Sequence, residues 1–397
     1  MMDFKLLGSI LLIVGTSIGA GMLALPIATA QLGFAGSLLL LFVCWIVMTL
    51  GAFLILEVNL WLPQNSNLIT MAKITLGPLG QLIAWITYLL LLYSLLCAYI
   101  AGGSDLFHHL FLARHIDVPR WVSSVCFTIL FGAVVYRGIR TVDYVNRGLM
   151  FVKLGSYILL SALLLPLISG TYLEQSHWEY LTSSTALTIT VASFGYATIV
   201  PSLRIYFAGD VKKLKFVILI GGLIPLICYI IWDAVIMGMI PLPGSHGLMA
   251  ILKSQNSTSD LVTTLSTISN HAAVSLFAKL FTSICVLTSF LGVSLCLTDF
   301  FADGLQLEKV GKNQLIIHLI TYLPPLFIVL FFPNAFIKAL EYAGLYSIVL
   351  LILLPAFMAW RGRYQKNIAK GFRVPGGKFI LIILILFGLG IIIRGAM

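Results

Sequence analysis

The sequence predicts an all-α membrane protein, and three observations support this fold class. Of the 397 residues, 60% are hydrophobic and only 10% are charged, whereas soluble domains carry about 25% charged residues. Apolar windows of about 20 residues, long enough to cross a bilayer as a helix, recur along the whole chain. Two of these windows are interrupted by glycine and hydroxyl residues, and a proline follows each interruption. Since no hydrophilic block is long enough for a separate soluble domain, we expect one polytopic membrane domain over residues 1–397.

Hydropathy divides the chain into eleven apolar spans. They cover approximately residues 6–30, 34–61, 79–104, 121–137, 147–169, 184–208, 214–240, 273–299, 312–332, 335–358 and 377–395. Lysine and arginine gather in the loops of one side, which accounts for the formal charge of +10 without a nucleic-acid partner. By the positive-inside rule the N-terminus is then cytoplasmic, and an odd number of spans places the C-terminus on the periplasmic side.

The first span carries Gly15, Gly19 and Gly21 in the middle of its apolar run, followed by Pro26. Glycine is a poor helix former and proline removes a backbone donor, so we expect the helix to break there. With Lys5 before it and Ala-Thr-Ala at its end, the span also resembles a secretory signal peptide. We reject that interpretation, because a signal peptide has no use for these glycines and ten more spans follow.

The sixth span has the same interruption, from Ser193 to Thr198, with Pro201 beyond it. Two interrupted helices in corresponding positions of two five-span halves, 6–169 and 184–358, indicate an inverted-repeat transporter with its site between them. The eleventh span is then an extra C-terminal helix. The alternative is that these glycines only let the helices pack closely.

Several motifs spread over nearly the whole chain point to a family. They are Gly15 to Pro26, Leu56 to Leu60, Val142-Asp143, Val145 to Arg147, Lys153, Thr288 to Val293, Tyr322 to Pro325 and Tyr342 to Gly344. They resemble the hydroxy/aromatic amino acid permeases, the tyrosine and tryptophan group of the amino acid–polyamine–organocation superfamily. The tail from Phe277 to Gly377 is most similar to the tyrosine permeases. The resemblance implies the leucine-transporter fold, with spans 1–5 and 6–10 as inverted repeats, and proton symport of an aromatic amino acid across a bacterial inner membrane.

Three places depart from the family's pattern. The sixth span reads Phe-Gly-Tyr-Ala at residues 194–197, where the relatives usually have Phe-Gly-Phe-His. Loss of that imidazole leaves the exact substrate open. Lys279 replaces an acidic residue and Glu341 replaces a glycine, so we expect the charge of the outer pathway to differ.

An amino acid leaves water only if both of its charged ends are paired. Backbone N–H groups after the first break suit the carboxylate, and carbonyls beside both breaks suit the ammonium group. The backbone candidates are Thr16, Ser17, Gly19, Ala20, Gly21, Met22, Phe194 and Gly195. Phe194, Tyr196, Tyr93 and Phe290 are candidates for an aromatic slot, although the last two equally suit ordinary packing.

Ionisable residues inside spans are functional candidates by default. Lys153 lies six residues past Arg147, about 9 Å deeper along the fifth span, where a lysine removed from water can exchange its proton near neutral pH. In related superfamily members a lysine of this helix replaces a sodium ion, and Lys153 is similar; Thr288 and Ser289 would line the same pocket. Glu57 is a second proton-coupling candidate. The alternatives are snorkelling for the lysine, a gate hydrogen bond for the glutamate and helix back-bonding for the hydroxyls.

We expect Asp233 to pair with Lys279, and Asp299 and Asp303 to be solvated at the cytoplasmic end. The loop over residues 241–270 is expected to hold a short helix acting as an outer lid, or to be a plain connector. The histidines and cysteines lack ligand spacing, so neither a metal nor a cofactor is expected.

Two other classes of protein remain as remote alternatives. A channel would need rings of charges or carbonyls around a pore, and a membrane-embedded enzyme would need a catalytic constellation. The sequence predicts a transporter of another neutral amino acid, or one coupled to sodium, as the nearer alternative, and it leaves the oligomeric state open.

Overall fold

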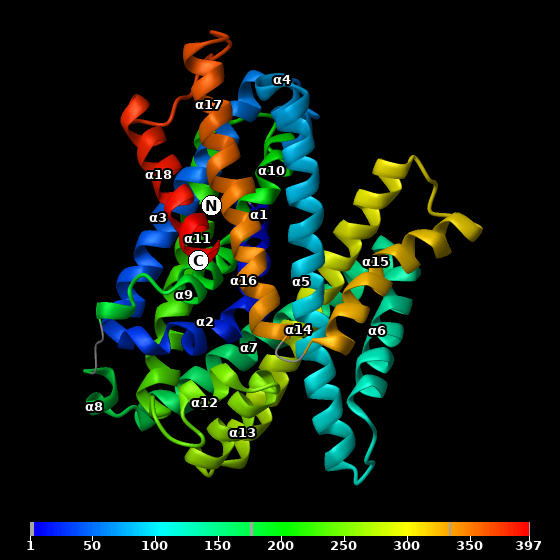
Figure 1. Cartoon of the computed structure of the whole chain (residues 1–397), viewed down its shortest axis with the longest axis vertical. Helices are drawn as coiled ribbons and strands as arrows, with labels where there is room; N and C mark the ends of the chain where they lie inside the picture. The colour runs from blue at the N-terminus through cyan, green and yellow to red at the C-terminus, as the bar shows by residue number, and fades with distance from the viewer. Residues whose placement is uncertain (1–3, 175–177, 333–334, 397) are drawn as a thin grey trace.

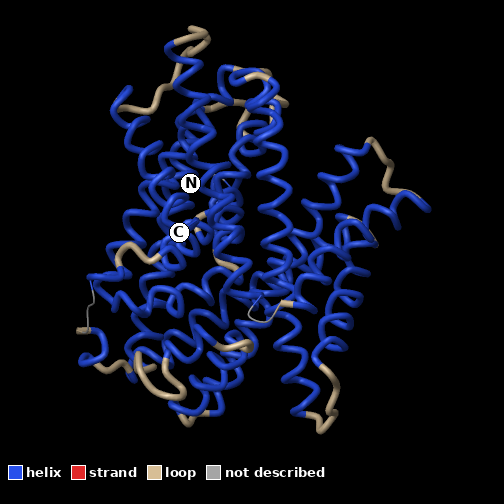
Figure 2. The backbone as a smooth tube through the Cα atoms, viewed as in Figure 1, coloured by secondary structure: helices blue, strands red, loops and turns tan. Residues whose placement is uncertain are grey.

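The computed structural model describes residues 4–174, 178–332 and 335–396, which form helices joined by short loops (Figures 1 and 2). Within these ranges nine helical segments are long and apolar enough to cross a membrane, and two shorter apolar helices, Phe4–Ser17 and Arg120–Tyr136, accompany them. Together they cover all the apolar windows of the sequence, although the run Ala20–Trp61 joins the end of the first window to the second. The prediction of an all-helical, multi-pass membrane protein is thereby confirmed.

The first apolar window breaks at its glycines. Helix α1 (Phe4–Ser17) ends and α2 (Ala20–Thr29) begins around Gly19, whose backbone is extended with φ −149° and ψ −154°. Pro26 lies inside α2, so the glycines and not the proline mark the break. A single 3-10 turn, η1 (Ala30–Leu32), then leads into α3 (Gly33–Trp61) through Gly33, whose φ of 71° favours glycine.

The sixth window breaks in a different way. Helix α9 (Ser184–Ser193) gives way to the tighter 3-10 turn η4 (Gly195–Ile199), and α10 (Val200–Tyr206) follows. Pro201 lies in the first turn of α10, where its missing N–H removes no helical hydrogen bond. A 3-10 stretch inside a helix often marks a hinge or a strained sequence.

The remaining elements are long helices and several short helical turns. They are α4 (Leu68–Leu76), α5 (Pro78–Ala113), α6 (Arg120–Tyr136), α7 (Ile139–Leu164), η2 (Leu165–Leu167), α8 (Gly170–Leu173), η3 (Trp178–Tyr180), α11 (Val211–Met239), α12 (Leu248–Lys253), α13 (Ser257–Ser269), α14 (Ala272–Leu305), α15 (Gly311–Phe331), α16 (Ala335–Ile348), the π turn η5 (Val349–Leu353), α17 (Leu354–Tyr364) and α18 (Gly377–Ala396). The loop after α11 thus holds two helices, α12 and α13, where the sequence suggested one.

The two broken helices lie in the middle of the bundle, while α6 and α15 form a flank beside α5 (Figure 1). Helix α2 packs on α9, and α1 packs on both α11 and η4. Helix α16 also packs on α9, and a side chain at Gly344 would collide with the backbone of Thr188. Close packing of α9 against α2 and α16 brings the second break next to the first.

Candidate substrate and coupling site

A tyrosine on α11 joins the two helix breaks. The hydroxyl of Tyr229 lies 2.6 Å from the carbonyl oxygen of Ser17 and 2.8 Å from that of Ser193, and donates to them. Its ring packs edge-on against Phe194, with 5.1 Å between the ring centroids. Sequence reasoning missed Tyr229, because an aromatic residue inside an apolar span has no spacing that sets it apart.

Lys153 reaches the first break from α7. Its Nζ donates to the carbonyl oxygen of Ile18 at 2.7 Å and to the hydroxyl of Thr288 at 3.3 Å, and the side chain is fully buried. In the described part of the chain, no carboxylate pairs with this ammonium group. The structure therefore places Lys153 at the helix break and not at the protein surface, and it brings Thr288 to the same point as the sequence suggested.

Ser289, the next residue on α14, caps the second half of the broken helix. Its Oγ accepts a hydrogen bond from the backbone N–H of Ala20 at 3.1 Å. A side chain at Gly19 would collide with this hydroxyl, so the cap depends on glycine at that position. At Gly21 an added Cβ would lie 3.0 Å from Oγ of Ser193, because α2 approaches α9 closely there.

Protein groups occupy several of the backbone sites expected for the substrate. The carbonyl of Ser17 accepts from Tyr229, and the N–H of Ala20 donates to Ser289. The N–H of Met22 donates to the carbonyl of Gly19 at 3.1 Å. A substrate bound at these groups must exchange internal hydrogen bonds for its own, so binding and rearrangement of the break are linked.

Thr16 and Gly195, two further candidates at the breaks, accept or donate hydrogen bonds within their own helical segments. Thr16 is exposed, and its hydroxyl turns back to the carbonyl of Ile13 at 2.8 Å. The carbonyl of Gly195 accepts from the hydroxyl of Thr198 at 3.3 Å. The hydroxyl of Thr16 is thus committed to its own helix, which leaves only the backbone of that residue for a substrate.

Of the four aromatic candidates, Phe194 and Tyr196 lie at the second break and are buried. The Tyr196 hydroxyl is hydrogen-bonded to that of Thr49 on α3 at 2.8 Å. A Cβ added at Gly222 of α11 would lie 2.5 Å from the Tyr196 hydroxyl. The Tyr196 ring is therefore held in place from both α3 and α11.

Tyr93 and Phe290 belong to another interface. Tyr93 donates to the carbonyl of Ile320 at 2.7 Å, which ties α5 to α15. Phe290 stacks on Tyr322 with 5.8 Å between centroids and 16° between the ring planes. Both residues pack against α15, which favours the packing interpretation for these two positions.

Glu57 is held in a buried ion pair. Nε and Nη2 of Arg363 donate to its Oε1 and Oε2 at 2.7 and 2.5 Å, and the backbone N–H of Val374 donates to Oε2 at 2.7 Å. Glu57 is fully buried and Arg363 is 6% exposed. The pair fastens α3 to α17 and to the loop before α18, and it shares no partner with Lys153, which favours the gate interpretation of Glu57.

The pairing of Asp233 with Lys279 is wrong. Oδ2 of Asp233 lies within hydrogen-bonding distance of the hydroxyls of Ser37, at 2.5 Å, and of Thr29, at 3.4 Å. Lys279 instead lines a cavity of about 440 Å³ between α5, α6, α13 and α14. Helix α11 packs on α2 and α3, so Asp233 faces the turn that joins these two helices and not α14.

Glu341 and Asp299 both have polar partners. Glu341 accepts from the Thr185 hydroxyl at 3.0 Å and pairs with Lys338 at 3.4 Å, so the departure from glycine adds a contact to α9. Asp299 is ion-paired with Lys309 and is not simply solvated, whereas Asp303 is exposed as expected.

Comparison with known proteins shows the family to which the chain belongs. Residues 2–394 match the model of the tryptophan/tyrosine permease family. The chain is 34% identical to "Tyrosine-specific transport system 1" of Haemophilus influenzae over 97% of this chain and 94% of the relative, and 32% identical to a "Tryptophan-specific transport protein" of the same species over 97% and 94%. It is also 30% identical to "Glutamine transporter 2" of Aliivibrio fischeri over 99% of both chains.

The fold is similar to that of MhsT, solved in complex with L-phenylalanine, with a TM-score of 0.68, 15% identity, and 98% of each chain covered. This likeness supports the leucine-transporter fold that the sequence resemblance implied. The family and the relatives are transporters, so the protein is a permease and not an enzyme. Its sequence over nearly the whole length, and the helices that this sequence forms, place the chain in the tryptophan/tyrosine permease family.

Proposed function

We propose that this permease takes up an aromatic amino acid, with tyrosine preferred, by proton symport across a bacterial inner membrane. The observation that carries the proposal is the junction of two broken helices through Tyr229, with a buried lysine at the first break. Paired broken helices present both N–H groups and carbonyls at mid-membrane, which suits a zwitterion. The tyrosine- and tryptophan-specific relatives support the aromatic class of substrate.

We infer eleven membrane crossings, with a cytoplasmic N-terminus and a periplasmic C-terminus. Residues 6–169 and 184–358 form the inverted repeats, and α18 is the extra helix. Alternating access then consists of movement of α2 and α9 relative to α3 and α14 around the breaks. The extended backbone at Gly19 and the 3-10 turn η4 supply the hinges.

The substrate carboxylate is assigned to the N–H groups of Ala20, Gly21 and Met22 at the start of α2. The ammonium group is assigned to the carbonyls beside Ser17 and Phe194. In this arrangement the substrate competes with the Tyr229 hydroxyl and with Ser289, so binding loosens the contacts that hold the breaks together. The rings of Phe194 and Tyr196 form the aromatic slot.

Lys153 is assigned to proton coupling. With a proton it binds the Ile18 carbonyl and the Thr288 hydroxyl, which joins α7 to α1 and α14. Without the proton, its attraction for the carbonyl falls. The two protonation states therefore stabilise different packings of the first break, which is what a coupling ion must do.

A second candidate, transport of another neutral amino acid, rests on the 30% identity to a glutamine transporter. Family membership alone therefore does not separate the substrates. The altered motif of η4, with alanine at position 197 in place of the family's histidine, lies at the residues that would contact the substrate side chain.

Uptake by purified protein in liposomes tests both the coupling ion and the substrate preference. We expect labelled tyrosine to accumulate when the outside is acidic, with no sodium present, and unlabelled aromatic amino acids to compete better than glutamine. Imposed sodium gradients serve as the matched control. Strict dependence on sodium would contradict proton symport, and stronger competition by glutamine would contradict the aromatic substrate.

A further inference from the structure

A second buried ionisable group lies between α2, α3 and α11. Asp233 of α11 is fully buried, as are Thr29 at the end of α2 and Ser37 near the start of α3. The carboxylate oxygen Oδ2 contacts both hydroxyls, whereas Oδ1 has no hydrogen-bond partner among the described residues. An ionised carboxylate carries charge on both oxygens, so an unpartnered buried oxygen is costly in that form.

The contacts around Asp233 contain more oxygen pairs than the hydroxyls have hydrogens. Oδ2 lies 2.5 Å from Oγ of Ser37, that Oγ lies 3.1 Å from Oγ1 of Thr29, and Oγ1 lies 2.8 Å from the carbonyl oxygen of Leu25. Two hydroxyl hydrogens cannot fill three contacts. If the carboxyl group carries a proton, each group donates to the next, from Asp233 through Ser37 and Thr29 to Leu25, and each of these three contacts holds one hydrogen. The longer contact of 3.4 Å between Thr29 and Oδ2 then needs none.

The helices around α11 bring no charge to neutralise an ionised Asp233. Helix α2 has no ionisable residue. The other helices packed on α11 do carry ionisable residues, but in the described ranges no ion pair joins any of them to Asp233. These residues are Lys5 of α1, Cys44 and Glu57 of α3, Arg140, Asp143, Tyr144, Arg147, Lys153 and Tyr157 of α7, Tyr172 of α8, and Arg204 and Tyr206 of α10. On α11 itself, Lys212, Lys213 and Lys215 lie about five turns away. A buried carboxylate without a counter-charge is strongly disfavoured, and protonation removes the cost.

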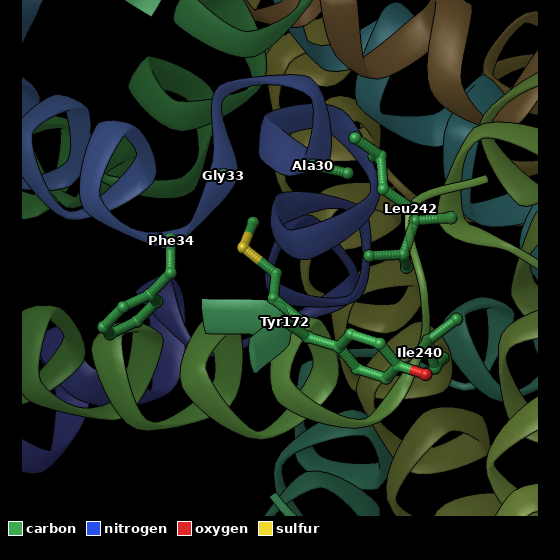
Figure 3. A pocket seen from close by; sticks show the side chains of 8 residues that line it. Ala30, Gly33, Phe34, Tyr172, Ile240 and Leu242 are labelled. Atoms are coloured by element: carbon green, nitrogen blue, oxygen red, sulfur yellow. The ribbon is translucent and has the colours of Figure 1, made fainter. Parts of the chain in front are cut away.

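A small cavity lies next to this cluster. It measures about 20 Å³ and is lined by Ala30, Gly33, Phe34, Met237 and neighbouring residues. Ala30 follows Thr29 in the chain, and Met237 is one helical turn beyond Asp233. Figure 3 shows the cavity between the turn that joins α2 to α3 and the side chains of Tyr172, Ile240 and Leu242. Its volume is sufficient for one water molecule, which needs about 10–15 Å³. Such a water molecule would lie beside Met237, one helical turn from Asp233.

From this geometry we propose that Asp233 binds a proton while α2 is packed against α3 and α11, and releases it when α2 moves away. The inference rests on the proposed function, and it adds a proton site distinct from Lys153. Asp233 lies one turn, about 6 Å, from Tyr229, whose hydroxyl holds both helix breaks. Movement of α2 that frees the substrate groups at Ala20 also breaks the Thr29–Ser37 contact, so the two events are linked.

Asp233→Asn tests this role, because asparagine has the shape of the neutral acid and cannot release a proton. We expect the variant to exchange labelled for unlabelled substrate like the unaltered protein. Concentrative uptake should fall by a factor of about ten for each unit of imposed pH difference, which is the contribution of one coupled proton. Asp303→Asn, at an exposed position of α14, is the matched control and should leave accumulation unchanged. Full accumulation by Asp233→Asn would overturn the proposal.

Infrared spectroscopy tests the protonation itself and does not depend on transport. The unaltered protein should show the carbonyl stretch of a protonated, buried carboxyl group at neutral pH. Asp233→Asn should lose that band, and Ser37→Ala, which removes one hydrogen-bond partner, should shift it. An absent band, or one that both variants leave unchanged, would overturn the assignment even if the Asn variant folds poorly. If the unaltered protein shows no proton-driven uptake but keeps the band, the proposed symport fails and the proton site at Asp233 stands.

Discussion

Two buried ionisable sites in this protein are built in opposite ways. At one site, Glu57 and Arg363 form a bidentate pair in which each charge faces its opposite, and the N–H of Val374 adds a further donor. At the other, the partners of the Lys153 ammonium group among the described residues are a carbonyl and a hydroxyl. The first site carries no net charge, whereas the charge of the second depends on whether a proton is bound.

The difference distinguishes a structural ion pair from a group that can change its protonation state. A paired charge keeps its protonation state, since losing the proton from arginine or adding one to glutamate would leave the partner alone in a low-dielectric interior. A lone buried lysine has no such constraint, and its two states interact differently with the break in the first helix. In this comparison Glu57 holds α17 against α3, and the absence of a paired charge at Lys153 among the described residues is consistent with the coupling role proposed for it.

Breaking the pair should have the largest effect on stability. Arg363→Met leaves the Glu57 carboxylate buried with only the N–H of Val374, so we expect a loss of about 3–5 kcal/mol in the free energy of unfolding. Denaturant unfolding in mixed micelles measures this loss. The same variant should also loosen the loop before α18, which limited proteolysis would detect.

The double variant Glu57→Gln with Arg363→Met is the matched control. It removes both charges, so it should recover most of the lost stability, because the cost lies in the unpaired charge and not in the missing bond. A double variant as unstable as the single one would mean that packing of the arginine side chain matters more than charge.

The sequence predicted well what depends on local pattern. Hydropathy located the apolar helices, and the glycines at 15–21 and 195 located the breaks to within a few residues. The depth of Lys153 follows from helical rise alone and agrees with its burial, whereas the coupling role of Lys153 stays a prediction. Its partner Thr288 followed from the family resemblance, since no local pattern connects residues that far apart.

Contacts across the bundle were beyond local pattern. Arg363 lies 306 residues from Glu57, in a segment with several other basic residues, so no sequence signal joins the two. Asp233 was assigned to a lysine by charge, but hydroxyls from α2 and α3 reach it instead. Both pairings depend on which helices lie next to each other, and that is determined by the packing of the whole bundle.

Tyr229 offers an intermediate test, because it is a neutral side chain that binds the carbonyls of both breaks. Tyr229→Phe keeps the ring against Phe194 and removes the one hydrogen shared between Ser17 and Ser193. Buried carbonyls that lose their donor cost about 1–3 kcal/mol, so we expect a loss of this size in unfolding free energy. Tyr144→Phe, at an exposed ring of α7, should cost nothing measurable. A variant of Tyr229 with full stability would show that water or the neighbouring helices satisfy these carbonyls.

Lys153→Met should have the smallest effect on stability and the clearest effect on coupling. Methionine has a similar length and apolar stem, and it removes the cost of burying an uncompensated charge. It also leaves the Ile18 carbonyl without its donor, which costs about 1–3 kcal/mol. Because these two effects oppose each other, we expect the free energy of unfolding to change by no more than about 1 kcal/mol, in contrast to Arg363→Met.

Transport by the same variant then distinguishes a coupling residue from a structural one. Exchange of labelled for unlabelled substrate requires only that the breaks open and close, so Lys153→Met should retain it. The proton that Lys153 binds favours one packing of the first break and so contributes to accumulation driven by an acidic exterior. Methionine cannot bind this proton, so we expect proton-driven accumulation to fall. Lys253→Met, at an exposed position of α12, is the matched control and should accumulate substrate normally. Proton-driven accumulation that is undiminished in Lys153→Met would leave the coupling role to Asp233 alone, and would make the bond to Ile18 a structural contact like that of Glu57 with Arg363.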